Sequence, residues 1–326
     1  MVSIENNNKI EAGRFFLIGW EGNHLDEPLE LIEHFRPAGL IFFRRNYPGS
    51  PEGLALQLKA IKKRAADLGL KPFILAIDNE GGDVKRLPPP FIELPKAASK
   101  LEPNEIKKLC YDSGLELRSI GFNLNLAPVL DVDVANGIMK TRSFGLSAQE
   151  VILRARAFIE GFESSGILTC GKHFPGLGAA TLDPHKELPT VDLDLEELLR
   201  VHLEPFRALR ANLSMVMTTH SLYPALDSKM ATFSEKIVKI LRKDIGFDGL
   251  ALSDDMEMGA VTANIGPGEA AIAATLAGHD LILVCRSRAV IEASVKALEE
   301  KIHTDRSLHI ALAKSQARLK NLVFWQ

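Results

Sequence analysis

A lysine and a histidine stand side by side after an apolar run, and an acid and a second histidine follow in a loop rich in glycine and proline. Lys172 and His173 come after the run 166–170, and Asp183 and His185 lie two residues apart further along. Such a loop is too polar for a core and is typical of a segment that binds or reacts. Lysine offers a charged hydrogen-bond donor, and histidine can move a proton near neutral pH. The stretch therefore predicts an active-site loop.

Polar side chains also end most of the other apolar runs. The candidates are Asp78 with Glu80, Asp131 with Asp133, His220, and Asp254 with Asp255. Each has a structural alternative, because aspartate caps helices well and a Gly-rich acidic segment can form a plain turn. Together they predict a pocket, provided that the fold brings the ends of these runs to one side.

The elements that would position these side chains alternate along the chain. Apolar runs predict eight strands, at 14–19, 39–43, 73–77, 123–129, 166–170, 214–219, 249–252 and 280–284. Periodicity and terminal signals predict helices at 29–35, 51–69, 103–120, 148–164, 194–211, 234–244, 269–277, 289–302 and 307–322. Eight alternations favour a (β/α)8 barrel over an open doubly wound sheet. Barrel enzymes build their sites at the C-terminal ends of strands, where the candidate side chains fall.

The chain is predicted to be a single domain. Its 326 residues fit one large barrel, and no Pro/Gly/Ser linker or change of composition marks a boundary. We therefore expect one catalytic barrel domain over 1–326, with C-terminal helices from about residue 289.

Composition excludes several classes of partner. A net charge of -3 and a pI near 6.3 give no basic surface for nucleic acid or an anionic membrane, so we expect neither, and a small neutral or mixed-charge ligand fits better. Residues 1–9 lack the charged start and apolar core of a secretory signal, and no apolar run approaches a bilayer span. The three cysteines show no CxxC spacing, so neither disulfides nor a zinc cluster is indicated. We expect a cytoplasmic protein, as a monomer or weak homo-oligomer.

The motifs also bear on three other chemistries. Neither GxGxxG after the first strand nor GxxxxGK[ST] occurs, which disfavours nucleotide binding. The histidines and aspartates could converge on a metal, but neither HxH nor HExxH is present, and we expect neither metal nor cofactor. Lys172 at a strand end also fits a Schiff-base lysine, as in aldolase barrels, although two carboxylates opposite it are better explained otherwise.

Four motifs together resemble family 3 glycoside hydrolases. They are KHFPGLGAATLDPHKELP at 172–189, DNEGGDVKR at 78–86, TRSFG at 141–145 and GFDGLALSDDMEMGA at 246–260. More narrowly, the chain resembles the single-domain bacterial β-N-acetylglucosaminidases of peptidoglycan recycling. The resemblance covers nearly the full chain and implies a barrel enzyme without a cofactor that removes GlcNAc from muropeptides.

The resemblance also implies roles for individual residues. Asp254, the first aspartate of SDD, would be the nucleophile of a retaining mechanism with a covalent glycosyl-enzyme. His185, on a mobile loop, would be the general acid/base, and Asp183 its partner. Sugar hydroxyl groups would be bound by Asp78, Arg86, Arg142, Lys172 and His173. An ion pair of Arg142 with Asp131 or Asp133 is the structural alternative.

Three positions depart from the family pattern. Leu177 replaces the usual His in KHFPGLG, Pro184 the usual Ser in DPH, and Asp83 the usual Arg after the glycine pair. Pro184 fixes its own φ and restricts Asp183, so a stiffer loop is expected. A β-glucosidase-like specificity, a phosphorolytic variant and a catalytically silent sugar-binding protein therefore remain as alternatives.

Overall fold

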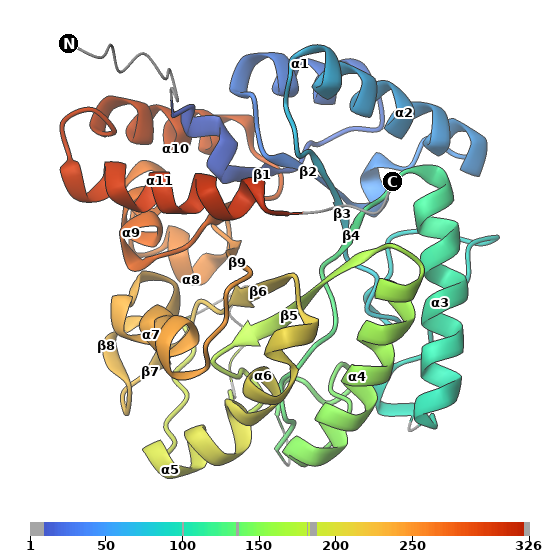
Figure 1. Cartoon of the computed structure of the whole chain (residues 1–326), viewed down its shortest axis with the longest axis vertical. Coiled ribbons are helices and arrows are strands. Elements are labelled where there is room, and N and C mark those ends of the chain that lie inside the picture. The colour runs from blue at the N-terminus through green and yellow to red at the C-terminus, as the bar shows by residue number, and fades with distance from the viewer. Residues whose placement is uncertain (1–9, 100, 135–136, 181, 183–187, 323–326) are drawn as a thin grey trace, which may run out of the picture.

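In the part of the chain that the structure describes, eight parallel strands close into a barrel (Figure 1). The computed structural model describes residues 10–99, 101–134, 137–180, 182 and 188–322. Each barrel strand pairs with the next one along the chain, and the last closes onto the first. The predicted (β/α)8 barrel is confirmed. Its strands are β1 (Phe16–Ile18), β2 (Gly39–Phe42), β3 (Ile74–Ile77), β4 (Leu124–Asn125), β5 (Leu168–Phe174), β6 (Met215–Thr218), β9 (Leu250–Asp255) and β10 (Leu281–Val284).

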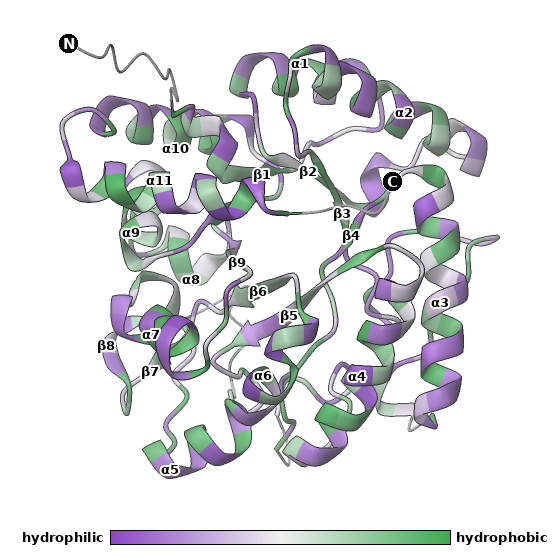
Figure 2. Ribbon diagram, in the orientation of Figure 1, coloured by the Kyte–Doolittle hydropathy of each residue, from purple (hydrophilic) through white to green (hydrophobic). Residues whose placement is uncertain are grey.

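Helices connect the strands and cover the outside of the barrel. Several begin at a side-chain cap: Ser50 Oγ accepts the N–H of Gly53, and Ser147 Oγ that of Glu150. In Figure 2, α3 and α4 alternate between hydrophilic and hydrophobic residues, as expected of helices with one face on a barrel. Within the described ranges, no helix has the length and apolar character needed to cross a membrane. The α-helices are α1 (Asp26–Phe35), α2 (Pro51–Asp67), α3 (Pro103–Ile120), α4 (Ala148–Ser164), α5 (Leu195–Glu197), α6 (Glu204–Leu209), α7 (Glu235–Lys239), α8 (Gly259–Thr262), α9 (Pro267–Ala277), α10 (Arg288–Lys301) and α11 (Arg306–Lys320).

Two strands are longer than the sequence predicts. β5 continues through Lys172 and His173, and β9 continues through Asp254 and Asp255. The prediction ended both strands at the last apolar residue, whereas the backbone keeps its pairing where the side chains become polar. The candidate side chains are therefore held by the barrel itself, which positions them more rigidly than a loop would.

Other predicted boundaries are wrong for local reasons. The fourth strand ends at Asn125, because Pro128 has no N–H to donate to a sheet. The chain still follows β5, since Cys170 N donates to Ala127 O over 2.9 Å. The predicted helices 194–211 and 234–244 are interrupted by the π-helical turns Leu198–His202 and Ile240–Asp244. The 3-10 turn Ala12–Phe15 precedes β1, and the hairpin of β7 (Leu222–Tyr223) and β8 (Asp227–Met230) was not predicted.

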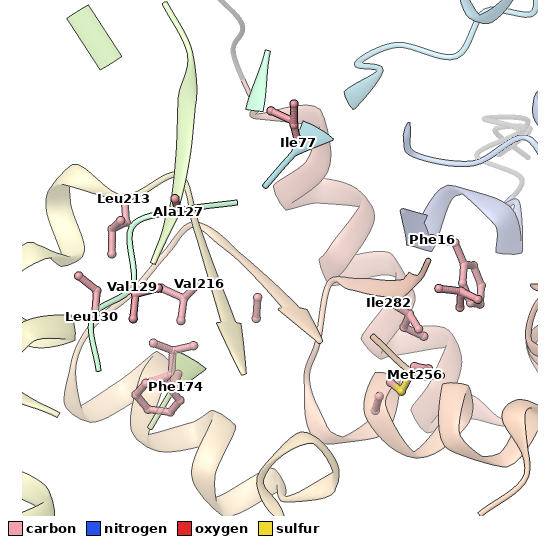
Figure 3. Close-up of a cluster of buried hydrophobic side chains, with 14 of the residues drawn as sticks. Phe16, Ile77, Ala127, Val129, Leu130, Phe174, Leu213, Val216, Met256 and Ile282 are labelled. Atoms are coloured by element: carbon pink, nitrogen blue, oxygen red, sulfur yellow. The ribbon is translucent and has the colours of Figure 1, made fainter. Parts of the chain in front are cut away.

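Apolar side chains fill the barrel and the layer around it. Along β1, Leu17 belongs to the cluster inside the barrel, whereas Phe16 and Ile18 belong to the cluster between strands and helices. Figure 3 shows members of this outer cluster, among them Phe16 with Ile282 and Phe174 with Val216. Each such side chain contributes about 1.5–3 kcal/mol by burial. This packing fixes the strand ends that carry the site.

A buried ion cluster lies at the N-terminal end of the barrel, away from the C-terminal ends of the strands. Asp280, which precedes β10, is 2% exposed and accepts the N–H of Ala251 over 2.8 Å. It also pairs with Arg242 and, over 3.0 Å, with Arg318 of α11. The C-terminal helix is thereby tied to the start of two strands.

Candidate active site

A cavity of about 890 Å³ opens among the C-terminal ends of the barrel strands. Six of the eight predicted site residues line it, and the other two, Asp183 and His185, lie outside the described residues. Its volume suits a small molecule, because ligand sites commonly measure about 300–1,000 Å³. The six lining residues are Asp78, Arg86, Arg142, Lys172, His173 and Asp254.

Two carboxylates and three cations form a connected network on one wall. Lys172 Nζ lies 2.9 Å from Asp78 Oδ1 and 2.6 Å from Glu80 Oε1. Arg86 Nη2 reaches the other oxygen of Asp78 at 2.8 Å. Arg142 donates two hydrogen bonds to the carboxylate of Glu80, from Nε over 2.9 Å and from Nη2 over 2.8 Å. The ion-pair partner of Arg142 is thus Glu80, not Asp131 or Asp133.

Burial and ion pairing compete in setting the charges of this network. Burial alone would raise the pKa of Asp78, but Lys172 and Arg86 outweigh it and hold that pKa well below its usual value. Burial likewise opposes ionisation of Glu80, yet Lys172 and Arg142 lower its pKa to about 2. Burial would lower the pKa of Lys172, but Asp78 and Glu80 raise it overall. Lys172 therefore stays charged, which is the opposite of what a Schiff-base lysine requires.

His173 is held between a carboxylate and an arginine. Its Nδ1 lies 2.7 Å from Asp131 Oδ2, and its Nε2 lies 3.3 Å from Arg142 Nη2. Asp131 Oδ1 additionally accepts the backbone N–H of His173 over 3.2 Å and that of Leu177 over 2.6 Å. Asp131, fully buried, thus supports the cavity from behind rather than lining it.

Asp254 and Asp255 stand at the end of β9 on the cavity wall. Asp254 Oδ1 accepts the N–H of Asp255 over 2.8 Å, which fixes its carboxylate. Asp255 Oδ1 accepts two N–H groups, from Glu257 and Cys285, each over 3.1 Å. Burial, and then the charges of Glu257 and Asp254, raise the pKa of Asp255 to about 7. Burial thus favours the protonated form of Asp255, the second of the two adjacent acids.

Side-chain oxygens join the end of β9 to the segment after β10. Ser253 Oγ accepts the N–H of Leu283 over 3.0 Å, and Glu257 accepts those of Arg286 and Ser287 over 2.6 and 3.0 Å. They act where the pairing of β9 with β10 shifts register. The hydrogen bonds accepted by Ser253 and Glu257 thus help to fix the position of Asp254.

An aromatic ring and two further cations complete the wall beside Asp78. The guanidinium of Arg45 lies 4.4 Å from the ring centre of Phe43, and that of Arg86 lies 5.1 Å from it. Arg45 Nε donates to Trp20 O over 2.8 Å, and Arg286 makes a bidentate pair with Glu21, at 2.6 Å for each bond. The cation–π contacts help to hold Arg86 against Asp78.

His220, another candidate, is fully buried and is not among the cavity-lining residues. Its Nδ1 lies 2.7 Å from Thr232 Oγ1, and its Nε2 lies 2.9 Å from Asp255 O. It therefore supports β9 from behind. Across the described residues, no group of three or more His, Cys, Asp or Glu side chains is arranged to hold a metal ion.

Comparison with known proteins decides the family. The model of the glycosyl hydrolase family 3 N-terminal domain matches residues 10–322. The chain belongs to glycosyl hydrolase family 3. It is therefore a glycoside hydrolase, as the four motifs predicted, and the cavity at the strand ends is the candidate site for a sugar.

Similar proteins of this family align with most of this chain. A β-hexosaminidase of Idiomarina loihiensis is 34% identical over 302 residues, which cover 88% of this chain and 90% of the relative. The solved family 3 β-N-acetylglucosaminidase of Paenibacillus sp. is 33% identical with a TM-score of 0.89 over 96% of this chain, which spans only 61% of that protein. The β-N-acetylhexosaminidase of Beutenbergia cavernae is 28% identical with a TM-score of 0.89, over 96% of this chain and 98% of its own.

Three residues that support the cavity wall have no role predicted from the sequence. Glu80 was named as a strand-end acid, but its bonds to Lys172 and Arg142 join segments far apart in the chain. Asp131 is predicted as a strand-end acid and as an alternative partner of Arg142, and the motifs give Glu257 no role. The sequence places Glu80 and Asp131 beside strand ends, which marks them as candidate site residues. Their hydrogen-bond and ion-pair partners cannot be predicted from these positions alone.

Proposed function

We propose that the protein is a retaining exo-β-N-acetylglucosaminidase, a β-hexosaminidase that releases terminal GlcNAc from peptidoglycan-derived muropeptides. The observation that carries the proposal is that the carboxylate of Asp254 shares one cavity with the charged network of Asp78, Lys172 and Arg142. The names of the similar proteins support the acetamido-sugar specificity.

The charged network binds the non-reducing sugar. Asp78 accepts hydrogen bonds from hydroxyl groups, while Arg86, Arg142 and Lys172 donate to hydroxyl oxygens. Hydrogen bonds to ions are stronger than neutral ones, and the salt bridges fix their directions in advance. His173 contributes at the same wall. The sugar is thus oriented with its anomeric carbon toward Asp254.

Asp254 is the nucleophile. Its Oδ1 is held by the N–H of Asp255, which leaves Oδ2 to attack the anomeric carbon. As the glycosidic C–O bond breaks, the leaving oxygen takes a proton from His185, and a glycosyl-aspartate forms. His185 then removes a proton from water, which attacks the same carbon and releases GlcNAc with retained configuration. Asp183 fixes the tautomer of His185 and supports its charged form.

The setting follows from the same proposal. The substrate is a small muropeptide, and the enzyme works without nucleic acid or membrane, as a monomer or weak homo-oligomer. The three cysteines are buried and free, which fits the reducing cytoplasm in which we place the enzyme. One barrel domain over the whole chain, ending in α10 and α11, carries the activity.

Trapping of the covalent intermediate tests the proposal. A 5-fluoro-GlcNAc donor with a good leaving group should leave a glycosyl adduct that peptide mass spectrometry places on Asp254. The adduct and the turnover of aryl β-GlcNAc should both be absent from Asp254→Ala. An adduct on another residue, or full turnover by Asp254→Ala, would refute the assignment.

A further inference from the structure

Asp131 is a buried acid whose carboxylate has three hydrogen-bond donors and no access to solvent. Its Oδ2 lies 2.7 Å from the ring Nδ1 of His173, and its Oδ1 accepts the N–H groups of His173 and Leu177. We infer that Asp131 is a positioning residue that fixes the tautomer of His173 and, through it, the direction of Arg142. The inference rests on the proposed function for its kinetic consequence, but not for its geometry.

The partners of His173 decide where its proton lies. A carboxylate accepts hydrogen bonds and a guanidinium only donates them. Nδ1 of His173 therefore carries the hydrogen that it shares with Asp131, and Nε2 presents a lone pair to Arg142 Nη2 at 3.3 Å. In the other tautomer, N–H groups of His173 and Arg142 would face each other. Only one neutral form of the ring satisfies both neighbours.

Arg142 is thereby oriented from two sides. Glu80 accepts from its Nε and Nη2, and His173 accepts from Nη2 as well. Among the described residues, nothing accepts a hydrogen bond from Nη1, so this group is available to the sugar. Without the His173 acceptor, Arg142 would keep its ion pair but lose one of the contacts that set its angle.

The same carboxylate fixes the start of the segment that leads toward Asp183 and His185. Asp131 Oδ1 lies 2.6 Å from the backbone nitrogen of Leu177, and on the other side the hydroxyl of Tyr223 donates to Gly176 O over 2.9 Å. Gly178 packs against the backbone, since a Cβ there would lie 1.8 Å from Val132 O. One buried acid thus joins the sugar-binding wall to this segment.

Asp133 provides a matched control. It lies two residues further on and is only 7% exposed, yet its Oδ1 is buried without a hydrogen-bond partner in the described structure. Asp133→Asn therefore makes the same chemical change in the same segment without touching His173.

The tautomer is measured first, on the whole protein without sugar. Ring 15N NMR, with His173 assigned through His173→Gln, should show Nδ1–H in the wild type and in Asp133→Asn. In Asp131→Asn the side-chain amide can donate to Nδ1, so the Nδ1–H signature should be lost. A wild-type ring protonated on Nε2 would overturn the inference, whatever the enzyme acts on.

Kinetics and binding then show whether the tautomer matters. Asp131→Asn should weaken GlcNAc binding in calorimetry, and lower kcat/KM, by about 10- to 100-fold, which corresponds to one lost hydrogen bond to a charged group. Asp133→Asn should change neither. In a double-mutant cycle, Asp131→Asn should have little further effect on GlcNAc binding once His173→Gln is present. Additive losses, or equal losses in Asp131→Asn and Asp133→Asn, would show a merely structural role and refute the inference.

Discussion

The ammonium group of Lys172 lies 2.6 Å from the carboxylate of Glu80, and both side chains are almost completely buried. The same carboxylate also receives two hydrogen bonds from Arg142. Glu80 therefore holds two of the three cations of this cavity wall at fixed distances. Removing it should affect both sugar binding and stability.

Glu80→Gln should lower kcat/KM for an aryl β-GlcNAc substrate by about 10- to 100-fold, because Lys172 and Arg142 each lose a charged partner. The free energy of unfolding should fall by about 3–5 kcal/mol, as expected when one member of a buried ion pair is removed. Urea unfolding and initial rates measure the two effects. The matched control is Glu93→Gln, since Glu93 makes an exposed salt bridge with Lys85 and should cost less than about 1 kcal/mol.

The stability lost in Glu80→Gln should depend on pH, because Glu80 stabilises the fold in its ionised form. The pKa of Glu80 is lowered to about 2, so its ionised form stabilises the fold above the usual carboxyl pKa of 4.5. This stabilisation is lost as the pH falls toward 2. The difference in unfolding free energy between wild type and Glu80→Gln should therefore shrink in acid. A difference that grows in acid would contradict the ion pairing of Glu80 with Lys172 and Arg142.

Periodicity predicted the barrel, strand-end chemistry predicted six of the residues that line the cavity, and the family resemblance added Arg86 and Arg142. The spacing of apolar runs is local, so α3 and α4 were predicted with their observed bounds, and the polar residues after each run mark the C-terminal rim. The bond between Glu80 and Arg142 spans 62 residues of sequence, and its existence depends on the closed barrel. Such partners follow from tertiary geometry, which a single sequence does not contain.

Short elements were missed for a related reason. The hairpin of β7 and β8 contains strands of two and four residues, and its exposed residues show no apolar alternation. The π-helical turn Leu198–His202 keeps a helical pattern of side chains and cannot be told from an α-helix by spacing. The catalytic roles of Asp254, Asp183 and His185 and the sugar-binding roles of the other site residues stay predictions.

Asp255→Asn should change how stability depends on pH. In the folded protein the pKa of Asp255 is raised to about 7, so the folded state keeps a proton that the unfolded state releases near the usual aspartate pKa of 3.8. Wild-type stability should thus fall as the pH rises between these values, by up to about 4 kcal/mol. Asparagine keeps the Oδ1 acceptor and carries no charge. Thermal unfolding should show similar stability in acid and a more stable variant at about pH 8. A variant that is less stable than wild type there would contradict a raised pKa.

Asp280→Asn should destabilise the barrel without altering its chemistry. The neutral amide leaves Arg242 and Arg318 without their shared counter-charge, at an expected cost of about 3–5 kcal/mol. The site lies at the opposite end of the strands, so kcat/KM at room temperature should be unchanged. Thermal unfolding and initial rates test both parts. Asp244→Asn, at an exposed position, should stay within about 0.5 kcal/mol of wild type.

His185→Ala tests the proposed general acid through the leaving group. A leaving oxygen of high pKa needs a proton in the transition state, whereas an activated aryl oxygen departs as an anion. Glycosylation of the variant should therefore slow far more with a disaccharide or alkyl glycoside than with a nitrophenyl or fluoride donor. Pre-steady-state rates isolate this step from hydrolysis of the glycosyl-enzyme.

The second half-reaction gives the same variant an independent readout. Without a base to activate water, the glycosyl-enzyme should accumulate, and a small anionic nucleophile such as azide should speed its breakdown. The matched control, Asp254→Ala, lacks the intermediate and should gain nothing by this route. Equal slowing with good and poor leaving groups would remove His185 from the role of acid.

Added phosphate tests the phosphorolytic alternative. Formation of sugar 1-phosphate in place of free GlcNAc would show that phosphate, rather than water, resolves the intermediate on Asp254.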